Sequence, residues 1–103
     1  METSPLPLTS SARVSTDSAP RYLGQLCKHF AHRVPASWSE GYLTGRVEFP
    51  MGVCELTAEN GVLTIRAAAE NEGDLARLES VIARHLERFM FREPQPISWA
   101  KED

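Results

Sequence analysis

The residues best suited to chemistry stand close together in one short segment, where Cys27, His29 and His32 fall within six positions. Thiolate and imidazole groups are common protein ligands of zinc and other transition metals. Helical geometry separates the three, because successive residues turn by about 100° and Cys27 therefore lies about 160° around the axis from His29. One metal ion cannot be bound by Cys27 and both histidines on an intact helix, so this string is not a zinc motif.

His29 and His32 share the other face of this expected helix, together with Gln25. A spacing of three residues places two Cβ atoms about 5–6 Å apart on a helix. The pair could bind a metal ion or haem weakly, or form a proton-sensitive patch near neutral pH. The alternative is a pair of solvated surface histidines, since the sequence identifies no third ligand.

A third histidine, His85, lies on the flank of the apolar stripe of a second expected helix. A partly buried histidine in such a place is usually hydrogen bonded to a backbone carbonyl or a carboxylate. The alternative interpretation is a pocket between the helices and a sheet that includes His85 and Tyr42.

The sequence motifs of catalysis are absent from the chain. It contains no Gly-rich phosphate loop, no H-E-x-x-H, no G-x-S-x-G and no paired cysteine motif. We therefore assign no catalytic residue, and no cofactor beyond the weak metal or haem binding considered above. The sequence favours a non-enzymatic protein.

The composition describes a single small domain and excludes several classes of protein. With 103 residues, of which 42% are hydrophobic, the chain can bury one core without a disulfide or a metal. The net charge of −3 disfavours nucleic-acid binding, which depends on neutralising phosphates. No apolar run reaches the length of a membrane span, and residues 1–20 lack the features of a secretory signal. We expect a soluble, cytoplasmic protein in which Cys27 and Cys54 are reduced, buried thiols.

The first expected helix carries His29 and His32. Asp17 and Ser18 are capping residues, and Pro20 fits the first turn. The helix should end near residue 33, because Pro35 disfavours helical geometry at the residue before it. Its apolar stripe consists of Leu23, Leu26, Cys27, Phe30 and Val34.

The second expected helix is the clearest element of the sequence. Asn71 can cap it, with Asp74 three residues further on. The segment 93–96, which contains two prolines, ends the helical region. Its apolar stripe consists of Leu75, Leu78, Ile82, Leu86 and Phe89.

Short segments of alternating polarity predict the strands of a sheet. Asn60-Gly61 is the strongest local signal, because both residues tolerate the positive φ that a two-residue type I′ hairpin needs. Strands are expected at 12–16, 36–40, 43–49, 53–58, 63–67 and 97–99.

The elements therefore follow the order β-α-β-β-β-β-α-β, with hairpin-linked strands that form an antiparallel sheet. Both helices must bury a stripe, and the simplest solution is an α+β two-layer sandwich with both helices on one face of the sheet. This order is similar to one lobe of a TATA-binding-protein-like fold. We expect one domain over residues 11–100, a disordered tail at 1–10 and a C-terminal tail at 101–103. The open face of the sheet should carry Thr44, Arg46, Glu48, Glu55, Thr57, Thr64 and Arg66.

Three segments in combination resemble the bacterial family "domain of unknown function 2218". They are RYLGQLCKHFAH at 21–32, GRVEFPMGVC at 45–54 and HLERF at 85–89. The family has no established activity, cofactor or substrate, so the resemblance carries over no catalytic residue. It implies an accessory role in iron handling, since some relatives are neighbours of siderophore-interacting reductases or are fused to them. The positions that recur in the family include His29, His32 and His85.

Three hypotheses for the function stay open at this point. The first is a non-enzymatic binding or accessory module, associated with iron-siderophore handling and with a siderophore-interacting reductase as its protein partner. The second is a protein–protein interaction or dimerisation module that uses the open sheet face. The third, and least favoured, is an enzyme with a pocket near His85.

Overall fold

A computed structural model of the chain describes residues 7–102. In this range the elements follow the predicted order, with a short 3-10 helix, η1, after the second strand. The α+β class is confirmed. The bounds are β1 Leu8–Ser15, α1 Ala19–Phe30, β2 Ala36–Trp38, η1 Glu40–Tyr42, β3 Thr44–Phe49, β4 Gly52–Glu59, β5 Val62–Ala69, α2 Glu72–Phe89 and β6 Ala100–Glu102.

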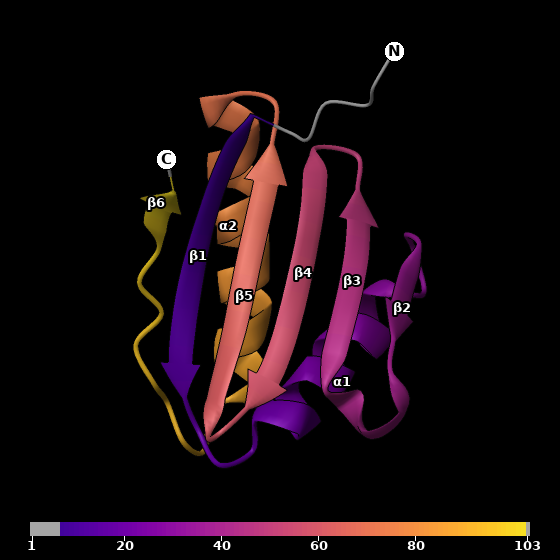
Figure 1. Ribbon diagram of the computed structural model, residues 1–103, viewed down its shortest axis with the longest axis vertical. Helices are drawn as coiled ribbons and strands as arrows, with labels where there is room; N and C mark the ends of the chain where they lie inside the picture. Colours follow the sequence, from indigo (N-terminus) through magenta and orange to yellow (C-terminus); the bar gives the residue numbers. More distant parts are fainter. Residues whose placement is uncertain (1–6, 103) are drawn as a thin grey trace.

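The described strands join one antiparallel sheet in the order β2-β3-β4-β5-β1-β6 (Figure 1). Strands β2 to β5 are neighbours both along the chain and in the sheet. The first strand instead lies between β5 and β6, and it pairs with β5 from Leu8 opposite Ala69 to Ser15 opposite Val62. The N-terminal strand is therefore an interior strand, and the sheet ends at β2 on one side and β6 on the other.

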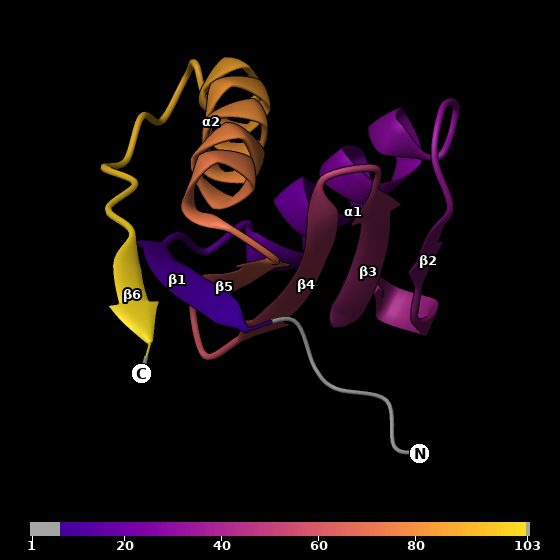
Figure 2. The same ribbon diagram turned by 90° about the horizontal axis from the view of Figure 1, so that it is seen from above.

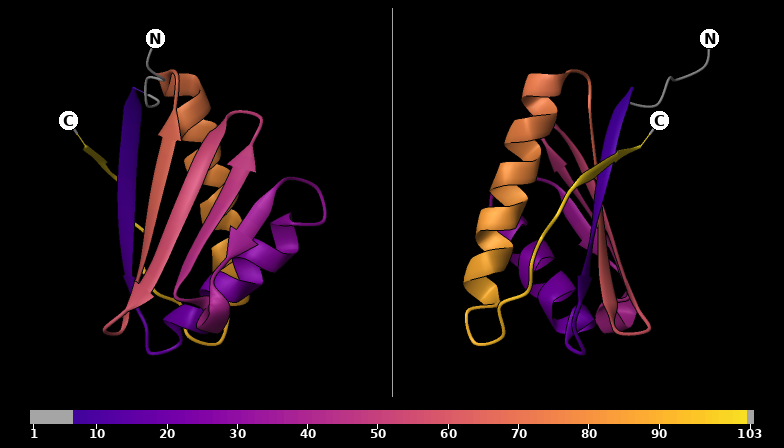
Figure 3. Two further views of the ribbon diagram at one scale, coloured as in Figure 1. Left: turned by 45° about the vertical axis from the view of Figure 1, so that its right-hand side comes forward. Right: turned by 90° about the vertical axis from the view of Figure 1, so that its left-hand side faces the viewer.

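Both helices pack on the same face of this sheet, which confirms the predicted two-layer sandwich (Figure 2; Figure 3). Helix α1 packs on β3 and β4, and α2 packs mainly on β5. The apolar stripes of the helices are buried against inward-facing strand residues such as Val47, Leu56 and Ile65. Burying each large aliphatic side chain contributes about 1.5–3 kcal/mol, which holds both helices on this face.

Neither helix of the described range has the length and apolar character needed to cross a bilayer.

The hairpin between β4 and β5 forms where the sequence predicts it. Asn60 has a φ of 53° and Gly61 a φ of 73°. Two consecutive residues with positive φ give a turn whose twist matches that of the flanking strands. This local signal therefore sets the register of β4 on β5, with Glu59 opposite Val62.

The two helices begin differently. The Asn71 side chain accepts a hydrogen bond of 2.8 Å from the backbone N–H of Asp74, so the predicted cap of α2 is confirmed. Ser18 stands at the cap position of α1 but makes no capping hydrogen bond through its side chain. Its backbone N–H instead donates to the Thr16 hydroxyl at 3.0 Å. The predicted side-chain cap at Ser18 is therefore wrong.

The ends of the sheet also differ from the prediction. Strand β1 begins at Leu8, inside the segment that we assigned to a tail, and the last strand is Ala100–Glu102 rather than 97–99. The two strands pair with each other, with Thr9 opposite Glu102. The start of β1 and the whole of β6 carry few apolar residues. Backbone pairing between strands holds these segments, so an alternation of apolar and polar residues does not predict them. Residues 1–6 and 103 of the predicted tails lie outside the described residues.

The opposite face of the sheet is open and polar, as predicted. Arg46 donates to Glu55 at 2.7 Å, and Arg66 donates to Glu102 at 3.0 Å. Arg66 also lies 3.9 Å from the other oxygen of Glu55. The charges of this face thus compensate one another across the strands. Exposed pairs of this kind contribute at most about 1 kcal/mol, so the face behaves as a solvated surface.

Candidate functional site

Helix α1 divides the chemistry-bearing residues as the helical angles predict. Cys27 is fully buried beneath the helix, and His29 is an exposed residue. Burial raises the pKa of the Cys27 thiol to about 11, and burial also raises the pKa of Cys54. A thiolate is the nucleophilic and metal-binding form of cysteine, so neither buried thiol is prepared for chemistry at neutral pH.

His29 of α1 meets His85 of α2 where the two helices face each other. The centroids of the two imidazole rings are 4.8 Å apart, and the ring planes are inclined at 47°. Phe30 lies 4.8 Å from His85, and Phe89 lies 5.9 Å from His29, both measured between ring centroids. We call these four residues the histidine–phenylalanine cluster. It joins ring-bearing residues from the last turns of both helices.

The hydrogen bond of His85 fixes which of its nitrogens is free. Its Nδ1 lies 2.7 Å from the carbonyl oxygen of Val81, one turn earlier in α2. A carbonyl oxygen only accepts, so this contact favours a proton on Nδ1. The Nε2 atom of a neutral His85 then keeps its lone pair. The predicted hydrogen bond from His85 to a backbone carbonyl is confirmed, and it orients the ring.

The surroundings of His29 oppose its protonation. Burial is the largest cause that lowers the pKa of His29, followed by repulsion from His85. His32, Arg33 and Arg88 add smaller repulsions of the same sign. His29 is therefore held neutral at neutral pH, which is the form that binds metals.

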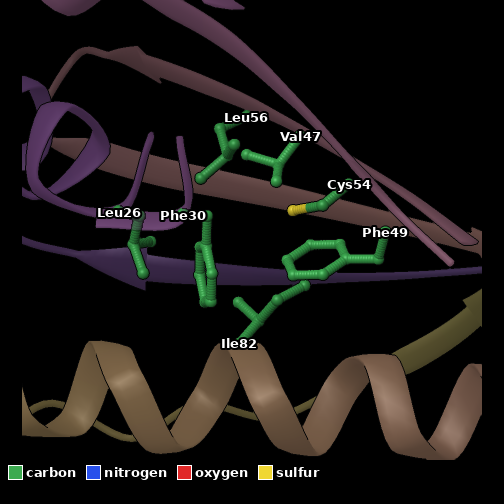
Figure 4. A pocket seen from close by; sticks show the side chains of 7 residues that line it. All are labelled: Leu26, Phe30, Val47, Phe49, Cys54, Leu56 and Ile82. Carbon is green, nitrogen blue, oxygen red and sulfur yellow. The ribbon is translucent and has the colours of Figure 1, made fainter. Parts of the chain in front are cut away.

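The interior beneath this cluster is filled. Figure 4 shows apolar side chains from the sheet, α1 and α2 that converge in the gap between the layers. The gap holds no space that a water molecule could occupy. A ligand would therefore reach the cluster from the outer surface of the helices. The side chains around the gap are Leu26, Phe30, Val47, Phe49, Cys54, Leu56 and Ile82.

Comparison with known proteins places this chain in a family. A family model described as "Uncharacterized protein conserved in bacteria (DUF2218)" matches residues 11–100. The chain belongs to the DUF2218 family. The resemblance drawn from the three sequence segments is thus confirmed, and the family is a bacterial one whose function is not assigned. No curated protein matches the chain.

A solved structure supports the fold of this DUF2218 domain. The chain is similar to the NMR structure of PA4090 from Pseudomonas aeruginosa, with 31% sequence identity and a TM-score of 0.75. The match covers 90% of this chain and 95% of that one. The two-layer arrangement thus recurs over nearly the whole length of both chains.

Among the residues that the structure describes, the others singled out from the sequence make no ring contact with the cluster. Helix α1 of the DUF2218 domain ends at Phe30, so His32 lies in the turn that follows it. No ring contact joins His32 to either of the other histidines within residues 7–102. The ring of Tyr42 packs over Gly24, and the Lys28 ammonium lies 4.7 Å from its centroid.

The cluster offers two imidazoles to a ligand. In the described part of the chain, no group of three or more His, Cys, Asp or Glu side chains is placed to hold a metal ion. A metal bound by His29 and His85 would complete its coordination with water or with groups of a small molecule. Such an open arrangement suits binding of a metal complex better than permanent retention of a structural ion.

Proposed function

We propose that this DUF2218 domain is a non-enzymatic binding module that holds a metal ion or a metal-bearing small molecule through His29 and His85. The supporting observation is the 4.8 Å separation of the two rings across the α1–α2 contact. The accessory role in iron-siderophore handling, with a siderophore-interacting reductase as partner, belongs to this proposal.

The chemistry of the pair supports a metal ligand. Neutral imidazole binds Fe, Zn, Cu and Ni ions, and the lowered pKa of His29 keeps its ring neutral. The Val81 carbonyl orients His85, as hydrogen-bonded partners of metal-binding histidines commonly do. Phe30 and Phe89 add flat apolar surfaces beside the rings, which a planar ligand such as haem can contact.

The test is a titration of the metal-free protein with Zn²⁺, with Fe²⁺ under anaerobic conditions, and with haem. Imidazole resonances in ¹⁵N-edited spectra report each histidine separately. We expect His29 and His85 to shift together and to share one dissociation constant. Removing either ring should weaken binding by about tenfold or more, since in metal sites the loss of a hydrogen-bonded partner of a ligand already costs about that much.

The matched control uses the third histidine. His29→Gln and His85→Gln should each abolish the coupled shift, whereas His32→Gln should leave it intact. Thermal unfolding of each variant shows that the fold is retained. If none of the three additives moves the His29 and His85 resonances, or if His32→Gln alone removes binding, the proposed site is wrong.

A further inference from the structure

A groove separate from the histidine pair runs between the first half of α1, the end of α2 and the segment after α2. Its volume is about 590 Å³. Pockets for small organic ligands typically have volumes of about 300–1,000 Å³. The groove touches the histidine–phenylalanine cluster only through Phe89, so it can be tested independently.

Three arginines line this groove: Arg21, Arg88 and Arg92. Within residues 7–102, none of their guanidinium groups lies within 4.0 Å of a carboxylate. Arg46 and Arg66 on the open sheet face are both paired with glutamates. Arg13, Arg33 and Arg84 also lack a carboxylate partner among the described residues, but only Arg21, Arg88 and Arg92 line this one concave place, on a chain whose net charge is −3. We call this place the arginine groove.

The acidic residue of the arginine groove forms no ion pair with these arginines and offsets only one of their three charges. Glu93 is the carboxylate among the lining residues. Its Oε1 accepts a hydrogen bond of 3.4 Å from the Thr16 hydroxyl and one of 3.5 Å from the Tyr22 hydroxyl. The groove thus keeps an excess of positive charge. A guanidinium group matches the planar geometry of a carboxylate by donating two parallel hydrogen bonds.

Gln25 adds a second, independent sign of a ligand. Its side chain lines the arginine groove, and its Oε1 is buried with no hydrogen-bond partner among the described residues. A buried acceptor without a donor is unfavourable, and native structures contain few of them. Because this oxygen has no contact with solvent, the Gln25 side chain would have to turn toward the groove before a hydroxyl or N–H group of a bound molecule could satisfy it.

Aromatic side chains supply the remaining contacts. Phe91 is 70% exposed, the largest exposed fraction among the large hydrophobic residues described. Its ring lies 5.4 Å from the Arg92 guanidinium carbon, and Phe89 and Tyr22 line the same groove. Flat apolar surfaces beside guanidinium groups favour a ligand that is itself flat and carries negative charge.

We infer that the arginine groove binds a small aromatic carboxylate that carries a hydroxyl group. The carboxylate pairs with the arginines at the end of α2, the ring contacts Phe89 or Phe91, and the hydroxyl donates to Gln25. This inference rests on the groove alone and holds whether or not the histidines bind a metal.

The test is a ¹H–¹⁵N titration with 3-hydroxybenzoate, benzoate and inorganic phosphate in a buffer that contains a metal chelator. We expect 3-hydroxybenzoate to shift the Gln25 side-chain amide and the backbone of residues 88–93. Benzoate should bind about fivefold more weakly, because it lacks one hydrogen bond of about 1 kcal/mol. Phosphate should bind more weakly than either aromatic acid.

Variants separate the contributions. Arg88→Gln combined with Arg92→Gln should weaken 3-hydroxybenzoate by about tenfold or more, since charge-assisted hydrogen bonds are lost. Arg46→Gln, which removes a paired arginine from the sheet face, should change nothing. In Gln25→Leu the preference for 3-hydroxybenzoate over benzoate should disappear.

Several results would overturn the inference. They are the absence of shifts at the groove up to the solubility limit of both acids, tighter binding of phosphate, or unchanged affinity in the Arg88 and Arg92 double variant. Loss of binding in His29→Gln would place the acid at the histidine–phenylalanine cluster instead. If His29→Gln still binds 3-hydroxybenzoate and the wild-type protein shows no response to metals or haem, the proposed function is wrong and the present inference stands.

Discussion

Gly45 of β3 lies directly beneath Cys27 of α1. A Cβ atom built on Gly45 would stand 2.6 Å from the Cys27 sulfur and 3.1 Å from the Leu23 Cδ2 atom. Both distances are shorter than ordinary van der Waals contacts, so the helix rests on the strand at a place where only glycine fits. This close approach sets the height of α1 above the sheet, and with it the position of His29 opposite His85.

Gly45→Ala should therefore destabilise the protein. Overpacking a well-filled core typically costs about 1–3 kcal/mol in the free energy of unfolding. Chemical denaturation followed by circular dichroism measures the change. Gly73→Ala is the matched control, because its nearest neighbour would lie at an ordinary 3.5 Å. In the first turn of α2, alanine should leave the stability unchanged or raise it by up to about 1 kcal/mol.

A double variant tests the cause of this effect. If the Cys27 sulfur is the clashing atom, the losses from Gly45→Ala and Cys27→Ala should not add, because the second change removes that clash. Additive losses would show that Gly45 is needed for another reason.

The caps of the two helices give a second prediction. Asn71→Ala removes the side-chain acceptor of the Asp74 N–H and should lower the free energy of unfolding by about 1 kcal/mol. Ser18→Ala changes the same position of α1, where no side-chain cap is made, and should cost much less. Equal losses in the two variants, measured by urea denaturation, would contradict the assignment of the caps.

The sequence predicts the parts of this fold that depend on neighbouring residues. The Asn60-Gly61 hairpin, the Asn71 cap and the apolar stripes of both helices are local patterns, and all are confirmed. The place of β1 between β5 and β6 depends on pairing between distant segments, which periodicity does not encode. The unformed side-chain cap at Ser18 is a further miss, and the contact that forms there instead joins the Ser18 N–H to the Thr16 hydroxyl.

The candidate site follows the same division. Helical angles correctly separate Cys27 from His29, and the position of His85 correctly predicts its bond to a carbonyl. The meeting of His29 with His85 could not be predicted, because it depends on how two helices pack on one sheet. The sequence likewise could not predict that Arg88 and Arg92 lack a carboxylate partner, because that depends on where the acidic side chains lie in the folded structure.

The burial of both cysteines predicts slow reaction with thiol reagents. With a pKa of about 11, only about one thousandth of Cys27 is thiolate at pH 8. Ellman's reagent should therefore label neither Cys27 nor Cys54 quickly in the native protein, and should label both at once in denaturant. Ser37→Cys, at an exposed position of β2, is the positive control. Rapid labelling of two thiols in the native wild-type protein would show that the core is open.

The environment of His29 predicts how stability depends on pH. Its pKa lies below the ordinary value of 6.5, so the unfolded chain binds a proton more readily than the folded one. Stability should rise as the pH increases through the interval between the folded pKa and 6.5, and should level off above it. His29→Gln should remove this contribution, which denaturation between about pH 5 and about pH 8 measures.

Variants of the neighbouring residues test the cause of this shift. In metal-free buffer, His85→Gln should raise the pKa of His29 more than His32→Gln does, because repulsion from His85 is the larger of the two. The amide of glutamine carries no charge at any pH used, so the change isolates the repulsion between the rings. A titration of the His29 resonance that reaches its midpoint at or above the ordinary value in the wild-type protein would contradict the packing of the two imidazoles. Agreement would show that His85 favours the neutral form of the His29 ring.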